Sequence, residues 1–294
     1  MLAHTTRSTL RFILTRLFVV TISILATILI TVTYSVVSRQ RSLIFVPRPP
    51  SLATPADYGV PYQALMLDNN QGGKIAAWWL TQNIDPYSKP TVLYCHGNAA
   101  TLSDLAHVAQ IFYMSGWNAL LFDYRGYGRS SPAIPELSED SVAQDATTAF
   151  NWLSERIERK KIFIWGHSLG SAIASSLAAR TQPSGLILEG GFPSIIEAAR
   201  ARYRFLPLFE WMAFDKFSTS KYLMKYKGPV IIAHADGDTV VPFYLGEKIY
   251  NSANNPKEFI RLKGINHQDF PSVHSEYMPH IKEVVDSWTK DNNY

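Results

Sequence analysis

The feature that most restricts the fold of this chain is the pentapeptide at residues 166–170, which reads GHSLG. It follows the apolar run IFIW at 162–165 and precedes the small-residue run SAIA at 171–174, a change typical of a strand passing into a packed helix. Glycines on both sides of a serine at such a junction indicate a turn too tight for flanking side chains. We therefore predict that Ser168 is an exposed nucleophile, the alternative being an ordinary glycine-rich turn.

Apolar runs alternate with helical patterns along the rest of the chain. Strands are expected at 63–67, 75–80, 91–95, 119–122, 162–165, 185–188, 230–234 and 258–262, and helices near 103–114, 138–158, 169–180, 244–252 and 272–290. This alternation predicts an α/β fold with a mostly parallel sheet and helices on both faces. The first two strands have no helix between them and are expected to form an antiparallel hairpin at one sheet edge.

A serine hydroxyl needs a base to activate it, and the base needs a third group to orient it. In sites of this kind the order along the chain is serine, acid, histidine. Downstream of Ser168, the apolar run 230–233 leads into a turn that holds Asp236 and Asp238. Asp238 is the predicted acid, while Asp236, directly before a glycine, suits a turn-capping role. Of the eight histidines, only His267 lies in the loop just after the next apolar run, so it is the predicted base.

A tetrahedral acyl intermediate also needs N–H donors for its oxyanion. The backbone N–H of Leu169, directly after the nucleophile, is one predicted donor. The second is the backbone N–H of Asn98, in the loop HGNA at 96–99 after a predicted strand, where Gly97 allows a close approach. The alternative for this loop is a plain turn between a strand and a helix.

Three motifs together, HGNA at 96–99, DYRGYGRS at 123–130 and GHSLG at 166–170, resemble the Bem46-like α/β hydrolases. Those include membrane-tethered serine hydrolases with lipid, thioester or ester substrates. The resemblance runs from about residue 43 to the C-terminus and includes LIFVP at 43–47. It implies the α/β-hydrolase fold and a triad of Ser168, Asp238 and His267, with 123–130 shaping a loop. It does not identify a substrate, because this fold hosts many chemistries.

Residues 17–37 contain no charged side chain. At about 1.5 Å rise per residue, this stretch matches the roughly 30 Å hydrocarbon core of a bilayer. It is longer than the apolar part of a cleaved signal peptide, the first alternative, and more uniformly apolar than a buried soluble helix, the second. We predict an N-terminal tail at 1–16, a transmembrane helix at 17–38, a proline-rich extended linker at 39–61 and a hydrolase domain at 62–294.

The charge distribution gives little information about the membrane orientation of the chain, and more about whether it binds nucleic acid. Three arginines precede the span and three follow it, so the positive-inside rule gives no contrast. The free N-terminal amine and the absence of acidic residues favour a cytoplasmic N-terminus, which would place the hydrolase domain on the extracytoplasmic side. Outside the first fifty residues the chain has 22 basic and 24 acidic residues, so no basic patch predicts nucleic acid as a partner.

Residues 190–228 interrupt the strand–helix alternation and are expected to form a short helical lid. The part at 198–217 mixes six aromatic residues with Arg200, Arg202 and Arg204. These could form an apolar acyl pocket with a basic site for an anionic head group, or a cover whose arginines face water. We interpret some aromatics as pocket residues and the arginines as solvent-facing.

The predicted function is hydrolysis of a carboxylic ester or thioester of a lipid-like acyl substrate through an acyl-enzyme. A serine peptidase with the same chemistry is one alternative. The other is a catalytically silent, membrane-tethered binding module, although such proteins usually lose a triad member. No grouping of His, Cys, Asp and Glu has metal-ligand spacing, so neither a metal nor a cofactor is expected.

Overall fold

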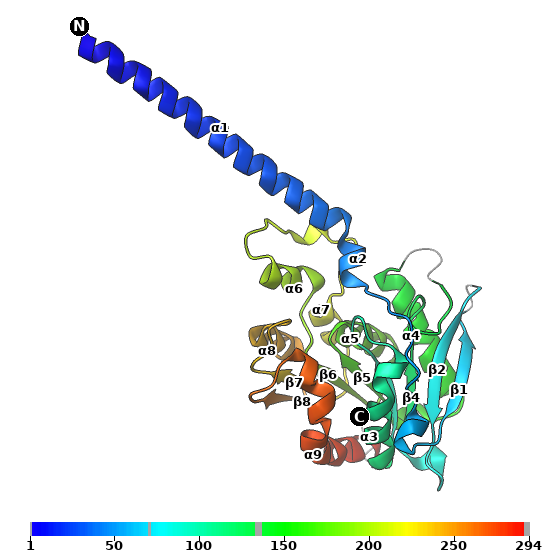
Figure 1. Ribbon diagram of the computed structural model, residues 1–294. Helices are drawn as coiled ribbons and strands as arrows, with labels where there is room; N and C mark the ends of the chain where they lie inside the picture. The colour runs from blue at the N-terminus through cyan, green and yellow to red at the C-terminus, as the bar shows by residue number, and fades with distance from the viewer. Residues whose placement is uncertain (1, 70–71, 133–136, 291–294) are drawn as a thin grey trace.

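The computed structural model describes residues 2–69, 72–132 and 137–290, and its centre is one eight-stranded sheet (Figure 1). The strand order across the sheet is β1-β2-β4-β3-β5-β6-β7-β8. The strands are β1 (Gln63–Asp68), β2 (Lys74–Leu80), β3 (Thr91–Cys95), β4 (Asn118–Phe122), β5 (Ile162–His167), β6 (Gly185–Glu189), β7 (Val230–Ala235) and β8 (Lys257–Leu262). Each predicted strand is present, with ends that differ by at most two residues.

The sheet is parallel from β4 through β3 and β5 to β8, and antiparallel at one edge. There β1 pairs with β2, and β2 pairs with β4, both antiparallel, which confirms the predicted edge hairpin. Because the other strands run the same way, the loops after β3, β5, β6, β7 and β8 meet at one edge of the sheet. Open α/β sheets bind their ligands at this edge.

Helices cover both faces of the sheet, as the alternation predicts. On one face lie α3 (Ala106–Met114) and α9 (Phe270–Lys290), and on the other α4 (Glu139–Ser154), α5 (Leu169–Thr181) and α8 (Phe243–Ser252). Strand β5 illustrates why its sequence is apolar throughout. Phe163 and Trp165 pack toward α3, with the Trp165 and Phe112 rings 5.3 Å apart, while Ile164 packs toward α5. A strand buried on both sides has no polar face.

The N-terminal segment is one continuous helix, α1 (Leu2–Ser38), which projects away from the domain in Figure 1. Its part from Arg11 to Ser38 contains an 18-residue window with a mean hydropathy of 2.4, and is long and apolar enough to cross a membrane. The predicted boundary between a tail at 1–16 and a span at 17–38 is therefore not a conformational one. No glycine or proline interrupts residues 1–38, so nothing ends the helix earlier.

The segment at 39–61, expected to be an extended linker, packs on the hydrolase domain instead. It begins with a short helix, α2 (Gln40–Ile44), whose last residue is buried together with Phe45. The Phe45 ring contacts the Phe217 ring at 5.9 Å, and the Val46 N–H donates to Asn98 Oδ1 at 2.8 Å. The chain has no helix or strand from residue 46 to 54, but Pro55–Tyr58 form a 3₁₀ turn, so the extended linker was predicted correctly only in part. The apolar residues before residue 46 gain more by burial than by remaining in water.

The predicted lid at 190–228 divides into two parts. The first contains α6 (Ile195–Arg202) and a loop with a 3₁₀ turn at Glu210–Met212, and it lies above the carboxyl edge of the sheet (Figure 1). The second contains α7 (Thr219–Leu223), and its residues Phe217, Thr219, Leu223 and Tyr226 are fully buried against the core. Only the first part is placed to cover a site.

Candidate active site

Ser168 lies at the tip of β5, at the junction with α5. Its backbone is strained, with φ 54° and ψ −119°, in a region that favours glycine. The flanking glycines make the turn possible. A Cβ on Gly166 would lie 2.4 Å from the Gly170 carbonyl oxygen, and one on Gly170 would lie 2.0 Å from the Cys95 carbonyl oxygen. The Ser168 N–H donates to the carbonyl of Glu189 at 2.8 Å, which ties the turn to β6.

The structure brings Ser168, His267 and Asp238 together from the ends of three strands. Ser168 Oγ lies 2.9 Å from His267 Nε2, and His267 Nδ1 lies 2.6 Å from Asp238 Oδ2. Asp238 and His267 are only 7% and 5% exposed. The other carboxylate oxygen of Asp238 accepts hydrogen bonds from the N–H groups of Val240 and Val241, at 2.9 and 2.7 Å. These distances let the serine hydroxyl donate to a histidine whose other nitrogen donates to a fixed carboxylate.

Asp236, the alternative acid, lies elsewhere in the same loop. Its carboxylate accepts from the Gly264 N–H at 2.8 Å and from Arg261 at 3.2 Å. The Gly264 N–H and the Arg261 guanidinium lower the pKa of Asp236, so this carboxylate stays ionised as a brace between two loops. This is the bracing role that its position before a glycine suggests.

His234, at the end of β7, is a second buried imidazole beside the acid. Burial lowers its pKa, so the ring is neutral and donates from Nε2 to the Val241 carbonyl at 2.8 Å. Its Nε2 is 3.6 Å from Asp238 Oδ2. Because His234 is uncharged, it supports the loop without neutralising the carboxylate that faces His267.

Two residues near the site were missed by sequence reasoning. The side-chain oxygen of Asn266 accepts from the N–H groups of His267 and Thr239, at 2.7 and 3.0 Å, so it joins the histidine loop to the aspartate loop. Glu189 is fully buried behind the serine turn, accepts a hydrogen bond from the Tyr277 hydroxyl, and has Oε2 3.8 Å from His167 Nδ1. An Asn directly before the candidate base His267 and a Glu at the end of an apolar strand were the available signals.

The loop HGNA, expected to supply an oxyanion donor, runs against the serine turn. A Cβ on Gly97 would lie 3.2 Å from Ser168 Cβ, so only glycine allows this approach without displacement. The Asn98 side chain is occupied elsewhere, since its Oδ1 accepts from the Val46 N–H and the Tyr127 hydroxyl. Leu169 is the first residue of α5, where backbone N–H groups have no partner within the helix. Asn98 and Leu169 both line the cavity that contains Ser168.

His96 and the DYRGYGRS segment are structural. Burial lowers the pKa of His96 to about 4, so its neutral ring donates from Nδ1 to the Gly97 carbonyl at 2.8 Å. Asp123 accepts from the Leu102 N–H at 2.8 Å, and Arg125 forms a buried ion pair with Asp145, also at 2.8 Å. Within the described residues, no group of His, Cys, Asp and Glu side chains is arranged to hold a metal ion.

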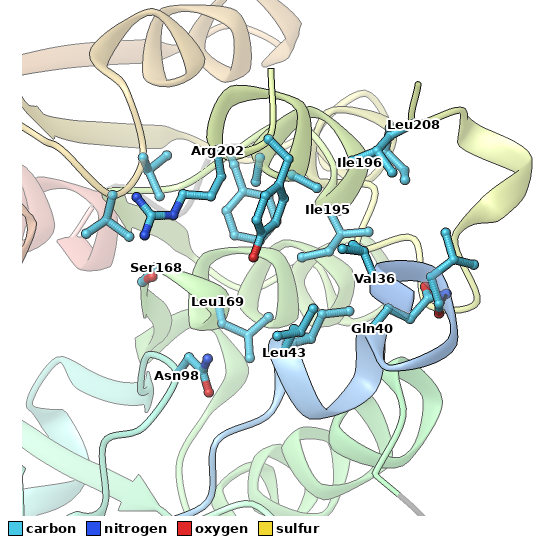
Figure 2. A pocket seen from close by; sticks show the side chains of 18 of the residues that line it. Val36, Gln40, Leu43, Asn98, Ser168, Leu169, Ile195, Ile196, Arg202 and Leu208 are labelled. Atoms are coloured by element: carbon cyan, nitrogen blue, oxygen red, sulfur yellow. Dashed lines mark hydrogen bonds between the residues drawn. The ribbon is translucent and has the colours of Figure 1, made fainter. Parts of the chain in front are cut away.

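Above Ser168 lies a cavity of about 520 Å³ with a mostly apolar wall (Figure 2). The wall comes from three parts of the chain: the end of α1 with α2, the helix α6 with the loop after it, and the loop after Asp238. Arg202 is the only charged side chain among the described lining residues, and Figure 2 shows its guanidinium directed to the Ser168 end. All three lid arginines are exposed, as expected, although Arg202 also lines the cavity. Arg200 is also held, donating to the Leu208 carbonyl at 2.8 Å.

Comparisons with known proteins agree with the fold and with a serine hydrolase. The family described as serine aminopeptidase, S33 matches residues 86–214. Lysophosphatidylserine lipase ABHD12 of Danio rerio is 38% identical over 190 residues, which are 58% of this chain and 49% of the relative. The chain thus spans about half the length of that relative. The uncharacterized protein Rv2307c of Mycobacterium tuberculosis is 31% identical over 234 residues, 79% of this chain and 82% of that one.

Among solved structures, the Pyrococcus furiosus esterase Pf2001 superposes with a TM-score of 0.68 at 19% identity, covering 83% of this chain and 97% of the esterase. At this identity the match shows the fold alone. The sequence matches show a family as well as a fold, because the chain covers most of the length of one relative and other relatives are named as lipases. The chain is therefore an α/β-hydrolase serine hydrolase and belongs to the Bem46-like family.

Proposed function

We propose that this protein hydrolyses the carboxylic ester or thioester of an amphiphilic lipid with a long acyl chain. The observation that carries the proposal is the hydrogen-bonded set of Ser168, His267 and Asp238 at the base of an apolar cavity. The name of the ABHD12 relative, a lysophosphatidylserine lipase, supports the same substrate class. The cavity of about 520 Å³ is in the size range of small-ligand sites.

In the proposed reaction, Ser168 Oγ attacks the substrate carbonyl while His267 Nε2 takes the serine proton. Asp238 stabilises the imidazolium that forms and keeps its ring oriented. The backbone N–H groups of Asn98 and Leu169 would bind the oxyanion. His267 then protonates the leaving alcohol or thiol, and water hydrolyses the acyl-enzyme by the same route in reverse.

The cavity favours a lipid over a peptide, although the matched family is described as an aminopeptidase. The strongest hydrogen-bond partner for the protonated α-amine of an aminopeptidase substrate is a carboxylate. None of the described residues that line the cavity is an aspartate or a glutamate, and the one charge is that of Arg202. A fatty acyl chain fits this wall better than a peptide N-terminus.

The acyl-chain preference tests the proposed substrate class. Each methylene that enters an apolar wall contributes about 0.8 kcal/mol, so kcat/KM should rise about fourfold per methylene until the cavity is full. We expect this in p-nitrophenyl esters of increasing length, with long chains preferred to acetyl. Ala198→Phe, which places a ring in the cavity, should shorten the preferred chain. Preference for acetyl esters or for aminoacyl amides would contradict the proposal.

Arg202 should recognise an anionic group of the substrate near the ester. A hydrogen bond to a charged group is worth about 1.5–3 kcal/mol, and solvent screening of the exposed Arg202 side chain reduces this value. Arg202→Gln should therefore raise KM about three- to tenfold for an anionic lysophospholipid. KM for a neutral monoacylglycerol should stay within about twofold. Arg204→Gln is the matched control, because Arg204 is exposed like Arg202 but does not line the cavity. Equal effects of Arg202→Gln on both lipids would refute this role.

A further inference from the structure

The loop that follows α6 exposes an unusual amount of aromatic surface. Its side chains Phe205 and Trp211 are 74% and 78% exposed, and Phe209 and Phe214 are 49% and 61% exposed. The rings of Phe209 and Trp211 are nearly parallel, with centroids 6.1 Å apart. We call residues 205–214 the aromatic loop. Soluble surfaces seldom gather so many large apolar side chains, and such patches mark contact with another apolar phase.

The aromatic loop packs against α1. Pro207, Phe209, Trp211 and Met212 of the loop form a small groove with Leu29, Ile30, Thr33, Tyr34 and Val37 of the helix. Two hydrogen bonds fix the loop at the base of α1: Gln40 Nε2 donates to the Met212 carbonyl at 3.1 Å, and the Phe214 N–H donates to Gln40 Oε1 at 2.8 Å. An ion pair between Arg41 and Asp215, at 2.8 Å, adds to them.

These contacts set the depth of the loop relative to the apolar helix. Leu29 precedes Ser38 by two and a half turns, a distance of about 13 Å along the axis. It lies inside the uncharged stretch 17–37, whose side chains are mostly exposed. When this stretch is in a bilayer, groups that touch it as far as Leu29 are at the level of lipid chains or of the interface. Trp is enriched at such an interface.

The catalytic cavity shares its wall with this surface. Val37 and Met212 line both the cavity above Ser168 and the groove between α1 and the aromatic loop. Figure 2 shows Val36, Gln40 and Leu43 on one side of the cavity and Ile196 and Leu208 on the other. A chain that leaves the bilayer between α1 and the loop would therefore meet apolar side chains along the way to the nucleophile.

We propose that the aromatic loop is inserted in the bilayer leaflet next to the hydrolase domain, and that acyl chains enter the cavity directly from this leaflet. The entry route rests on the function proposed above, whereas the insertion of the loop does not. The partner is the lipid surface itself, and the substrate is an amphiphile that stays in the leaflet by its chain until its ester reaches Ser168.

Depth-dependent quenching tests the insertion without any activity measurement. The full chain with Trp211→Cys is labelled with an environment-sensitive dye and placed in vesicles containing nitroxide-labelled phosphatidylcholine. Cys95 does not interfere, because burial raises the pKa of its thiol to about 12. We expect strong quenching at position 211, as for Leu25→Cys in the apolar helix, and none for Tyr87→Cys at the far end of the sheet. Quenching at 25 but not at 211 would overturn the insertion.

The entry route is tested with the double variant Phe205→Ser/Trp211→Ser. Both side chains are exposed and neither lines the cavity, so the fold should be kept. We expect turnover of an ester embedded in vesicles to fall about tenfold or more, since two interfacial anchors are lost. Turnover of soluble p-nitrophenyl butyrate should be unchanged. The entry route would be overturned if the double variant matched the parent protein on both esters, or if its turnover of both esters fell by the same factor. Failure of the proposed function would instead appear as a parent protein that cleaves neither ester.

Discussion

Ser168→Ala should lower kcat on a long-chain ester about a million-fold, to the level left by binding and oxyanion donors alone. The alanine keeps the backbone and removes only the Oγ that lies 2.9 Å from His267 Nε2, so the protein should remain folded. Covalent labelling with a fluorophosphonate probe gives the same test without a known substrate. The parent protein should label and Ser168→Ala should not.

Three further variants separate the roles within the site. His267→Ala should be about as inactive as Ser168→Ala, and Asp238→Asn should lose about 10⁴-fold, because the histidine loses its orienting carboxylate. Asp236→Asn is the matched control in the same loop, since Asp236 bonds to Arg261 and Gly264. It should keep its activity within about twofold, an exposed hydrogen bond having little influence on the rate. Labelling of Ser168→Ala, or inactivation by Asp236→Asn, would contradict the proposed assignment.

Gly170→Ala should have the largest effect on stability. The added Cβ would lie 2.0 Å from the Cys95 carbonyl oxygen and 2.6 Å from that of His96, and both are backbone atoms that cannot move aside alone. We expect a loss of at least about 4 kcal/mol, a large share of the stability of an ordinary domain. Urea unfolding of the detergent-solubilised protein, followed by tryptophan fluorescence, measures it.

Gly59→Ala is the control for Gly170→Ala. Gly59 has φ 70°, and a Cβ there would meet nothing within 4 Å. Its replacement should therefore cost only the strain of a left-handed alanine, about 1 kcal/mol. If the two variants unfolded at the same urea concentration, the close packing of the serine turn on β3 would not be the reason for its glycine.

The sheet and the loop that carries each candidate residue could be predicted because local sequence encodes them. Strand β5 is apolar on both faces, the glycines at 166 and 170 mark the turn, and Asp238 and His267 follow successive strands. Parallel strands then bring these loops to one edge. Such features depend on neighbours within a few residues along the chain.

The wall of the cavity could not be predicted in the same way. It depends on α2 and the aromatic loop meeting across more than 170 positions, through contacts such as Gln40 with Met212 and Phe214. A five-residue helix such as α2 is too short to give a periodic sequence pattern. The prolines that follow it predicted an extended chain for the whole of 39–61. Which lid arginine lines the cavity likewise depends on tertiary contacts. Arg200 donates to the Leu208 carbonyl, and Arg202 lines the cavity.

The end of α1 and the helix α2 form one side of the cavity above Ser168. The segment that would anchor this enzyme in the membrane therefore also helps to select its substrate. A protease cutting after Arg39 or Arg41 would release a hydrolase that still carries Ser168, His267 and Asp238. The released domain would lack Val36 and Val37, and water would enter the cavity on the side that these residues line. If the proposed function holds, shedding would leave in solution an enzyme that cleaves small esters without a preference for lipid esters.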